Sequence, residues 1–341
     1  MTRLRRKPSF SALNLSKLLM LGAILLLGVR LRAQSCDTSS DLEDATRSAI
    51  TAAGQRYFDM AAKGDTASLR QNAVPSLASD FSGIENAVKE RQKDLTGAKA
   101  TQKSVFLLGV EGTGPLAHGE FYCGVFGKNG QTSTSAVFYL DGLQPGKYAI
   151  DILETTGQAR LSFSLILVQT GNDWKLGGLY IRPETTSGHD ADWFSARARE
   201  YKGKGQLHNA WFYFVEARNL ISPLSFMSTA TTDKLFDESK GAQPADVPAD
   251  GKTTDLTAGA ATYKLTAIFP QTVGDELDLV VRYQAADVSN TTQAYQSNVA
   301  VIGALVAKYP ELKEAFAGVV ARAVDPSGRD YGTLLAMKEI K

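Results

Sequence analysis

The sequence has few of the residues that build metal sites and nucleophilic sites. Its 341 residues include three histidines and two cysteines, and these five have no spacing typical of zinc ligands. It also has no Gly-x-Ser-x-Gly elbow, no phosphate-binding loop of the P-loop type and no dinucleotide-binding glycine pattern. We therefore expect no metal and no cofactor, and nothing in the sequence favours nucleophilic or phosphoryl-transfer catalysis.

No apolar run is long enough to span a membrane. A span needs about 20 apolar residues, whereas Leu18–Val29 is followed at once by arginine. A basic stretch precedes this run, and the small residues Ala33 and Ser35 follow it. This three-part layout predicts a secretory signal over residues 1–35, with cleavage after Ala33 or Ser35. We expect an exported protein, either periplasmic or extracellular.

Basic residues are scarce outside that segment. The signal holds seven of the 37 lysines and arginines and none of the 36 acidic residues, which leaves 30 basic against 36 acidic residues and a net charge of about −6. Nucleic-acid binding needs clustered basic side chains that displace counterions from phosphates. This balance argues against a nucleic-acid partner.

The two cysteines are Cys36, directly after the signal, and Cys123, inside an apolar stretch. An even number of cysteines in an exported chain suggests a disulfide, so we predict a Cys36–Cys123 bridge. Two alternatives remain open. In the first alternative, Cys36 is the lipidated residue of an envelope lipoprotein, although Ala33 stands where such signals carry a large aliphatic residue. In the second, both cysteines are free thiols.

Helices come first in the chain and strands follow. Apolar residues at helical spacing predict an amphipathic helix over 41–63, and a second helical segment, broken near Pro75, continues to about Leu95. Stretches rich in β-forming residues are separated by Gly, Asn, Asp and Pro turns, and they predict strands over 104–112, 119–127, 135–143, 147–157, 159–171 and 173–183. This order predicts an α+β fold with an antiparallel sheet.

The order of elements and the closing hairpin resemble those of the NTF2-like (cystatin-like) superfamily. The resemblance covers about residues 42–183, and its most specific part is Asp173-Trp174-Lys175-Leu176 in the last hairpin. It implies a strongly curved sheet whose concave face is covered by the N-terminal helices, forming a cone. Leu143-Gln144-Pro145-Gly146-Lys147-Tyr148 departs from this pattern and resembles the turn of a small β-sandwich. We interpret it as an elaborated hairpin within the sheet.

Enzymes of this superfamily often place an acid, a histidine or a tyrosine inside the cone. The residues that could point inward here are Tyr57, Glu120, Tyr122, Tyr139, Asp151 and Tyr180. Their strand register is uncertain, and a slip of one residue sends each side chain to the opposite face. We therefore assign no catalytic residue. The predicted ligand-binding pocket consists of Tyr57, Glu120, Tyr122, Tyr139 and Tyr180.

A helical pair over 190–225 follows and resembles a single tetratricopeptide repeat. Phe194, Ala198, Tyr201, Ala210, Phe214 and Ala217 occupy that family's characteristic positions, although Arg197 replaces the usual leucine. One repeat cannot bury its own apolar face, so the pair is expected to pack on a neighbouring domain. The aromatic run Trp211–Phe214 offers an alternative, a protein-binding surface. His189, Asp190 and Asp192 could hold a divalent ion, but helix capping explains these residues more simply.

The remaining chain predicts a linker and a small domain. Residues 228–258 are polar and nearly free of large apolar side chains, so they are predicted to form a flexible linker, with Leu235 and Phe236 as an anchor midway. Strands over 261–270, 276–284, 318–324 and 332–340, with a helix over 291–316 that bends near Pro310, predict a ββαββ domain over 259–341. This domain resembles no family that we can name.

These observations favour a non-catalytic exported protein. The expected partner is either a small ligand in the cone or a protein held by the helical pair, and membrane attachment is expected only through the signal or a lipid on Cys36. The alternative is an NTF2-like enzyme that transfers a proton on a small apolar substrate. An open cavity lined by Tyr, Glu or Asp would favour ligand binding, whereas a filled core would favour a scaffold or interaction protein.

Overall fold

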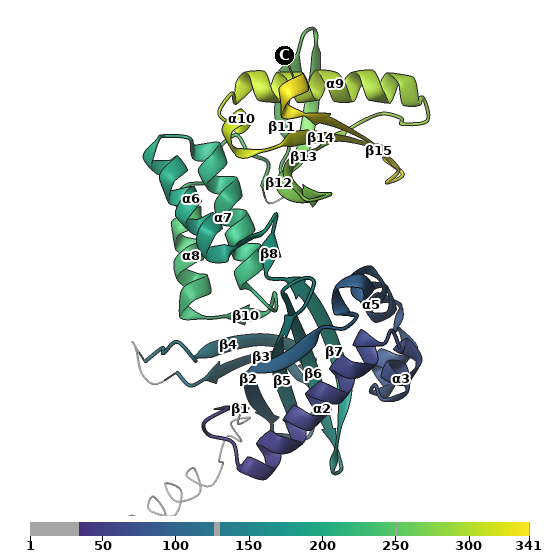
Figure 1. Ribbon diagram of the computed structural model, residues 1–341, viewed down its shortest axis with the longest axis vertical. Helices are drawn as coiled ribbons and strands as arrows, with labels where there is room; N and C mark the ends of the chain where they lie inside the picture. Colours follow the sequence, from purple (N-terminus) through teal and green to yellow (C-terminus); the bar gives the residue numbers. More distant parts are fainter. Residues whose placement is uncertain (1–33, 126–129, 250, 341) are drawn as a thin grey trace, which may run out of the picture.

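The chain forms an α+β structure with mostly antiparallel sheets, as the sequence predicted. The structure is a computed structural model that describes residues 34–125, 130–249 and 251–340. The predicted signal lies outside these residues except for Gln34 and Ser35, which begin strand β1 (Gln34–Thr38). From the N-terminal sheet at one end, the chain passes through a group of helices to the C-terminal sheet at the other end (Figure 1).

The N-terminal sheet has five strands in the order β1-β2-β5-β6-β7. All five pair antiparallel. The strands after β1 are β2 (Lys99–Val110), β5 (Gly146–Thr156), β6 (Leu161–Thr170) and β7 (Asp173–Pro183). In β5 the six residues 148–153 are all buried, because both faces of this central strand are covered.

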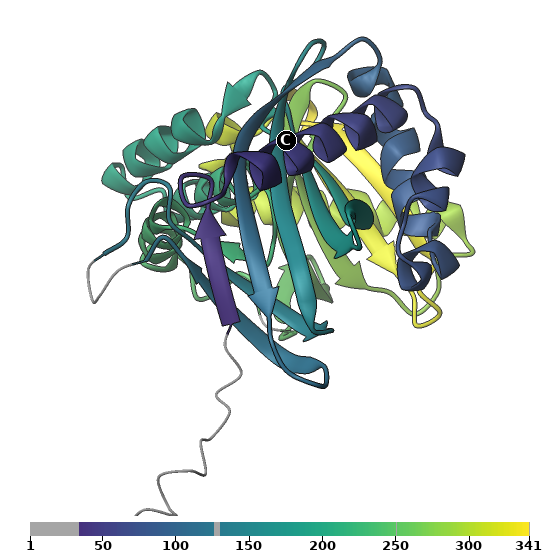
Figure 2. The ribbon, with the colours of Figure 1, turned by 90° about the horizontal axis from the view of Figure 1, so that it is seen from below.

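Four helices cover one face of this sheet. They are α2 (Asp44–Ala62), α3 (Thr66–Gln71), α4 (Pro75–Ser79) and α5 (Ser82–Leu95). The long helix α2 crosses the strands (Figure 2). Its buried residues recur at helical spacing, and Tyr57 and Phe58 pack with Phe163 and other apolar side chains of the sheet. This face of the sheet is filled by the protein's own side chains.

A second, smaller sheet covers part of the opposite face. It consists of β3 (Leu116–Cys123), β4 (Ala136–Leu143) and the short β10 (Met227–Ser228), in the order β10-β4-β3. Phe138 of β4 meets Phe106 of β2 edge to face, with ring centroids 5.0 Å apart. The Leu143–Tyr148 turn, which we interpreted as an elaborated hairpin within the main sheet, instead carries the chain from β4 of the smaller sheet to β5 of the main sheet.

A helical group links the two ends of the molecule. A short hairpin of β8 (Thr185–Thr186) and β9 (His189–Asp190) leads into α6 (Ala191–Gly203), α7 (Leu207–Ile221) and α8 (Ala230–Lys240). Asp190 caps α6, since its Oδ1 accepts a hydrogen bond from the Trp193 amide at 3.0 Å. Within the described chain, no three His, Cys, Asp or Glu residues are grouped as they would be around a metal ion.

Helix α8 lies within the segment that we predicted to be a flexible linker. Thr229 and Thr232 form a reciprocal capping box at its start, and Leu235 is buried, whereas Phe236 is 46% exposed. A helix with so few apolar residues gives little periodic signal, because its stability depends on the caps and on one buried anchor. The linker prediction was wrong for this part of the segment.

The C-terminal sheet has five strands in the order β11-β12-β13-β14-β15. The strands are β11 (Thr254–Ala258), β12 (Ala261–Val273), β13 (Glu276–Gln284), β14 (Gly318–Val324) and β15 (Asp330–Ala336). Helices α9 (Thr291–Lys308) and α10 (Leu312–Ala315) separate β13 from β14, with the break at Pro310, and a 3₁₀ turn, Met337–Glu339, follows β15. Strand β11 was also assigned to the linker. The last strand, predicted over 332–340, ends at Ala336, because Met337–Glu339 form the 3₁₀ turn; β12, β13 and β14 were predicted.

The helical group and the C-terminal sheet share one hydrophobic core. Phe194 of α6 and Phe212 and Phe214 of α7 belong to the same buried cluster as Leu279 of β13 and Leu305 of α9. Of the aromatic run, Phe212, Tyr213 and Phe214 are buried and Trp211 is partly buried. The run therefore packs between elements of this chain, which leaves little of it for a partner. None of the helices described has the length and apolar character needed to cross a membrane.

Candidate functional site

A cleft of about 760 Å³ lies between the N-terminal sheet and the helical group. Its floor is the sheet face opposite α2, and its roof is formed by the start of α6, the end of α7 and the start of α8. Its apolar lining comes from Phe106, Ile152, Leu220, Ile221, Pro223 and Met227. Most of the polar lining consists of hydroxyl groups, contributed by Thr38, Ser39, Ser40, Ser104, Ser133, Thr134, Ser135, Ser162, Thr229 and Thr231.

A β-bulge in β2 sets which side chains reach the floor. The register between β2 and β5 shifts between Gln102 and Ser104, so that Lys103 is the extra residue. Beyond the bulge, Ser104 and Phe106 line the cleft, whereas Gln102 reaches Asp151, whose carboxylate meets α2 on the other side of the sheet. A bulge that re-aims a side chain in this way is a frequent feature of functional sites.

Ion pairs at one rim fix the charged lining. Glu184 lies 3.6 Å from Lys103 Nζ and 3.5 Å from Arg160 Nη2, and Lys103 also pairs with Glu154. Arg47 donates hydrogen bonds to the carbonyl oxygens of Ser39 at 3.0 Å and Leu42 at 2.7 Å, which holds the loop before α2. These cations are already engaged, so the described residues of the cleft include no free basic cluster.

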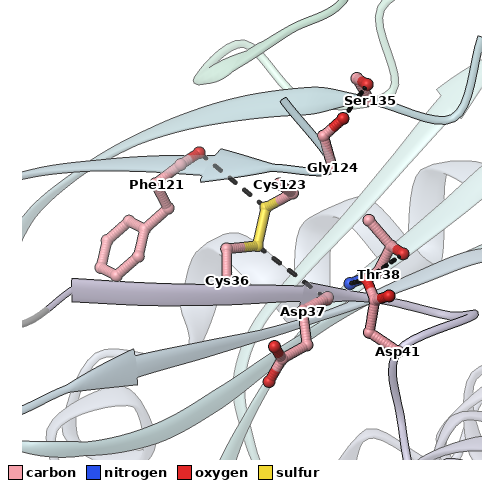
Figure 3. The surroundings of a disulfide bond; sticks show 8 residues. All are labelled: Cys36, Asp37, Thr38, Asp41, Phe121, Cys123, Gly124 and Ser135. Atoms are coloured by element: carbon pink, nitrogen blue, oxygen red, sulfur yellow. Dashed lines mark hydrogen bonds between the residues drawn. A yellow bond between two sulfur atoms is a disulfide. The ribbon is translucent and has the colours of Figure 1, made fainter. Parts of the chain in front are cut away.

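The predicted disulfide is confirmed, and it adjoins the cleft. Cys36 of β1 and Cys123 of β3 are bonded, with their Cα atoms 4.9 Å apart (Figure 3). Cys36 is therefore neither a free thiol nor available to carry a lipid. Two residues beyond Cys36 the chain reaches Thr38 in the cleft lining, and Gly124, next to Cys123, accepts a hydrogen bond from Ser135 Oγ at 2.6 Å.

The five residues of the predicted cone pocket do not form a pocket. Tyr57 is fully buried in the core between α2 and the sheet, where its hydroxyl donates to the Trp174 carbonyl at 2.9 Å. Burial raises the pKa of this hydroxyl, consistent with a structural role. Tyr180 lies on the opposite sheet face and packs edge to face on Phe226, with centroids 5.6 Å apart.

The other three predicted residues lie together on an outer surface. Glu120, Tyr122 and Tyr139 belong to the β3–β4 hairpin, and the two tyrosines are 54% and 50% exposed. Tyr122 donates a hydrogen bond to Glu120 at 2.7 Å, which raises the pKa of the tyrosine. The sequence left the register of these strands open; in the structure the hairpin belongs to the smaller β10-β4-β3 sheet, and both tyrosines are exposed.

Among the candidates for the cone that lie on strands, Asp151 is the one buried beside α2. One carboxylate oxygen accepts a hydrogen bond from Gln102 Nε2 at 2.8 Å, and Oδ2 has no hydrogen-bond partner among the described residues. Desolvation raises the pKa of this carboxyl to about 7. It faces Gly54 of α2, and it is not part of the cleft lining.

Sequence reasoning missed the cleft, because its residues come from segments far apart in the chain. One signal was present: Ser162 and Ser164 alternate with apolar residues in β6, so hydroxyl groups occupy one face of an otherwise apolar strand. The roof gave no comparable signal, since α8 itself was not expected.

The comparisons add no relative from which a role could be transferred. No protein-family model, no curated protein and no solved structure matches this chain.

Proposed function

We propose that this protein is an exported, non-catalytic binding protein that holds a small organic ligand in the cleft between the N-terminal sheet and the helical group. In this proposal the N-terminal domain is NTF2-like and the α6–α7 pair is tetratricopeptide-like. The observation that carries the proposal is the cleft itself, because it combines a volume of about 760 Å³ with an apolar floor and a rim of hydroxyl groups. Small-molecule sites typically have this size and this combination of surfaces.

The lining indicates the kind of ligand that fits. Phe106 and Ile152 offer contact to an apolar body, and the surrounding serines and threonines both donate and accept hydrogen bonds. The arginines and lysine of the rim are held by carboxylates or carbonyl groups. The best fit is therefore an amphiphilic molecule with an apolar body and several hydrogen-bonding groups, bound without a dominant ion pair.

The second candidate function is proton-transfer catalysis, and Asp151 is the observation that favours it. A buried carboxyl with a pKa near 7 is suited to act as a general acid or base. Asp151, however, faces Gly54 and the core beneath α2, and it is not itself part of the cleft lining. We therefore rank ligand binding first.

A cleft-filling substitution tests the binding proposal. Ser104→Trp places an indole on the floor and Thr231→Trp places one at the roof, whereas Thr272→Trp on the exposed surface of β12 is the matched control. The probe is 8-anilinonaphthalene-1-sulfonate, followed by its fluorescence, together with a library of small amphiphiles screened by saturation-transfer NMR. We expect both cleft variants to weaken binding at least about tenfold, a loss of about 1.4 kcal/mol, and the control to bind like the wild type. Equal binding by all four proteins, or none by the wild type, would rule the site out.

A further inference from the structure

The Cys36–Cys123 disulfide joins two segments that form one wall of the cleft. We call this the cleft wall, and it consists of residues 38–40, at the end of β1 and beyond it, and residues 133–135, which precede β4. Thr38 lies two residues after Cys36, and Ser135 is hydrogen-bonded to Gly124, the residue after Cys123. Figure 3 shows Thr38 and Ser135 on either side of Gly124, close to the two sulfur atoms.

Besides the disulfide, single hydrogen bonds hold this wall: Arg47 donates to the Ser39 carbonyl at 3.0 Å, and the Glu120 amide of β3 donates to Gln34 Oε1 of β1 at 3.1 Å. Strand β1 is an edge strand that pairs over five residues with β2, whereas Cys123 belongs to β3 of the other sheet. The disulfide is thus the covalent link between the two sheets at this edge. Thr38 is tied locally to Asp41, which accepts a hydrogen bond from the Thr38 amide at 3.0 Å.

Gly124 contacts both halves of the wall. A Cβ built on Gly124 would lie 2.9 Å from the Thr38 methyl group, so the glycine backbone already packs tightly against that side chain. Gly124 has a φ of +63°, and its carbonyl accepts a hydrogen bond from Ser135. This continuous series of contacts runs from the bridge to the lining, which means that a shift of β1 relative to β3 moves both halves.

We propose that the redox state of the Cys36–Cys123 bridge controls ligand binding in the cleft, an inference that rests on the proposed binding function. With the bridge intact the cleft wall is held in place and the cleft is preorganised, so binding does not have to order it. With the bridge reduced, β1 keeps its pairing with β2 and only non-covalent contacts with β3, such as the hydrogen bond from the Glu120 amide to Gln34 Oε1. The wall then opens locally, and the ligand binds more weakly. A dithiol protein of the export compartment is the class of reductant that this requires.

The chemistry is a thiol–disulfide exchange. Cys36 is half-buried and Cys123 is fully buried, so a thiolate of the dithiol attacks the Cys36 sulfur and the electron pair of the S–S bond leaves with Cys123, which takes up a proton. The second thiolate of the reductant then attacks the mixed disulfide and releases Cys36, which is protonated in turn. The protein gains two electrons and two protons, and the reductant becomes a disulfide.

Hydrogen exchange tests the coupling without any ligand. Oxidised wild type, wild type reduced with dithiothreitol, and the Cys36→Ser/Cys123→Ser variant are compared by mass spectrometry. We expect amide exchange in peptides covering 38–41 and 133–135 to rise at least about tenfold in the last two samples, while β6, β7 and the C-terminal sheet stay unchanged. Unchanged exchange in the cleft wall would overturn the proposal, and so would an equal rise throughout the N-terminal sheet, which would make the bridge a general staple.

Binding of 8-anilinonaphthalene-1-sulfonate then separates this inference from the proposed function. We expect its Kd to rise at least about fivefold on reduction, about 1 kcal/mol, with no change in the already weakened Ser104→Trp variant. Equal affinity in the oxidised and reduced protein, with Ser104→Trp still impaired, would overturn redox control and leave the site intact. If Ser104→Trp and wild type behave alike in both states, the binding site itself fails, and the exchange data alone decide whether the bridge controls the wall.

Discussion

At the scale of single residues, burial separates the candidate residues that lie in the protein interior from those that lie on its surface. Six residues were candidates for the interior of the cone, and only Tyr57 and Asp151 are buried between the sheet and α2. Residue type and strand alternation can predict that a side chain leaves the strand on one face. They cannot predict which layer covers that face, since the β3–β4 hairpin leaves the main sheet, and a bulge changes the alternation at Lys103.

Asp151 makes stability depend on pH in a defined direction. Its pKa is about 7 in the folded protein against an ordinary value of 3.8, so between these values the folded state binds more protons than the unfolded state. The contribution of Asp151 to the free energy of unfolding is therefore largest below about pH 4, falls as the pH rises towards 7 and stays level above it. The loss is at most about 4 kcal/mol, since each pKa unit corresponds to about 1.4 kcal/mol.

Asp151→Asn should remove this dependence. Asparagine keeps an oxygen acceptor for Gln102 but has no charge to desolvate, so we expect a flatter profile of unfolding free energy between pH 4.5 and 7.5 in urea titrations. Glu90→Gln, an exposed change on α5, is the control and should follow the wild type. A wild-type profile that rises over this range would contradict the assignment.

At the scale of elements, helices and strands with periodic apolar residues were predicted, whereas those in polar segments were missed. Helix α2 and strands β2 to β7 were expected within a few residues of their bounds, because their apolar residues repeat at the period of the element. Helix α8 and strand β11 were missed, since each buries only one large apolar residue, Leu235 and Leu256. The cleft could not be predicted because its roof depends on α8.

The packing of α2 on the sheet provides a test at this scale. Gly54 lies where a Cβ would come within 1.9 Å of Asp151 Oδ2, whereas Gly303 in the middle of α9 has open space around it. We expect Gly54→Ala to destabilise the protein by about 1–3 kcal/mol, because the carboxylate and helix must move apart. Gly303→Ala should stabilise it by about 0.5–1 kcal/mol, since alanine favours helix. Urea denaturation measures both, and equal effects would contradict this packing.

At the scale of the whole molecule, the described chain has two centres of stability. One hydrophobic cluster runs through α6, α7, α8 and the C-terminal sheet, and two others lie on the two faces of the N-terminal sheet. We expect calorimetry to resolve two transitions. Phe163→Ala should lower only the N-terminal transition and Leu305→Ala only the other, each by about 2–5 kcal/mol of stability. A single transition lowered by both changes would show that the protein unfolds as one unit.

The strands of the C-terminal sheet are joined in two antiparallel groups that meet at a single parallel pair. β13 and β14 are the one parallel pair among the described strands of this sheet, and α9 and α10 form the crossover between them. On either side of that pair the strands are joined as antiparallel neighbours, so the sheet consists of a β11–β13 meander and a β14–β15 hairpin. A chain divided between β13 and α9 would leave both halves with their local pairings intact. The two fragments would need only the parallel seam and the packing of α9 to reassemble, which makes this the natural position for a split-protein reporter.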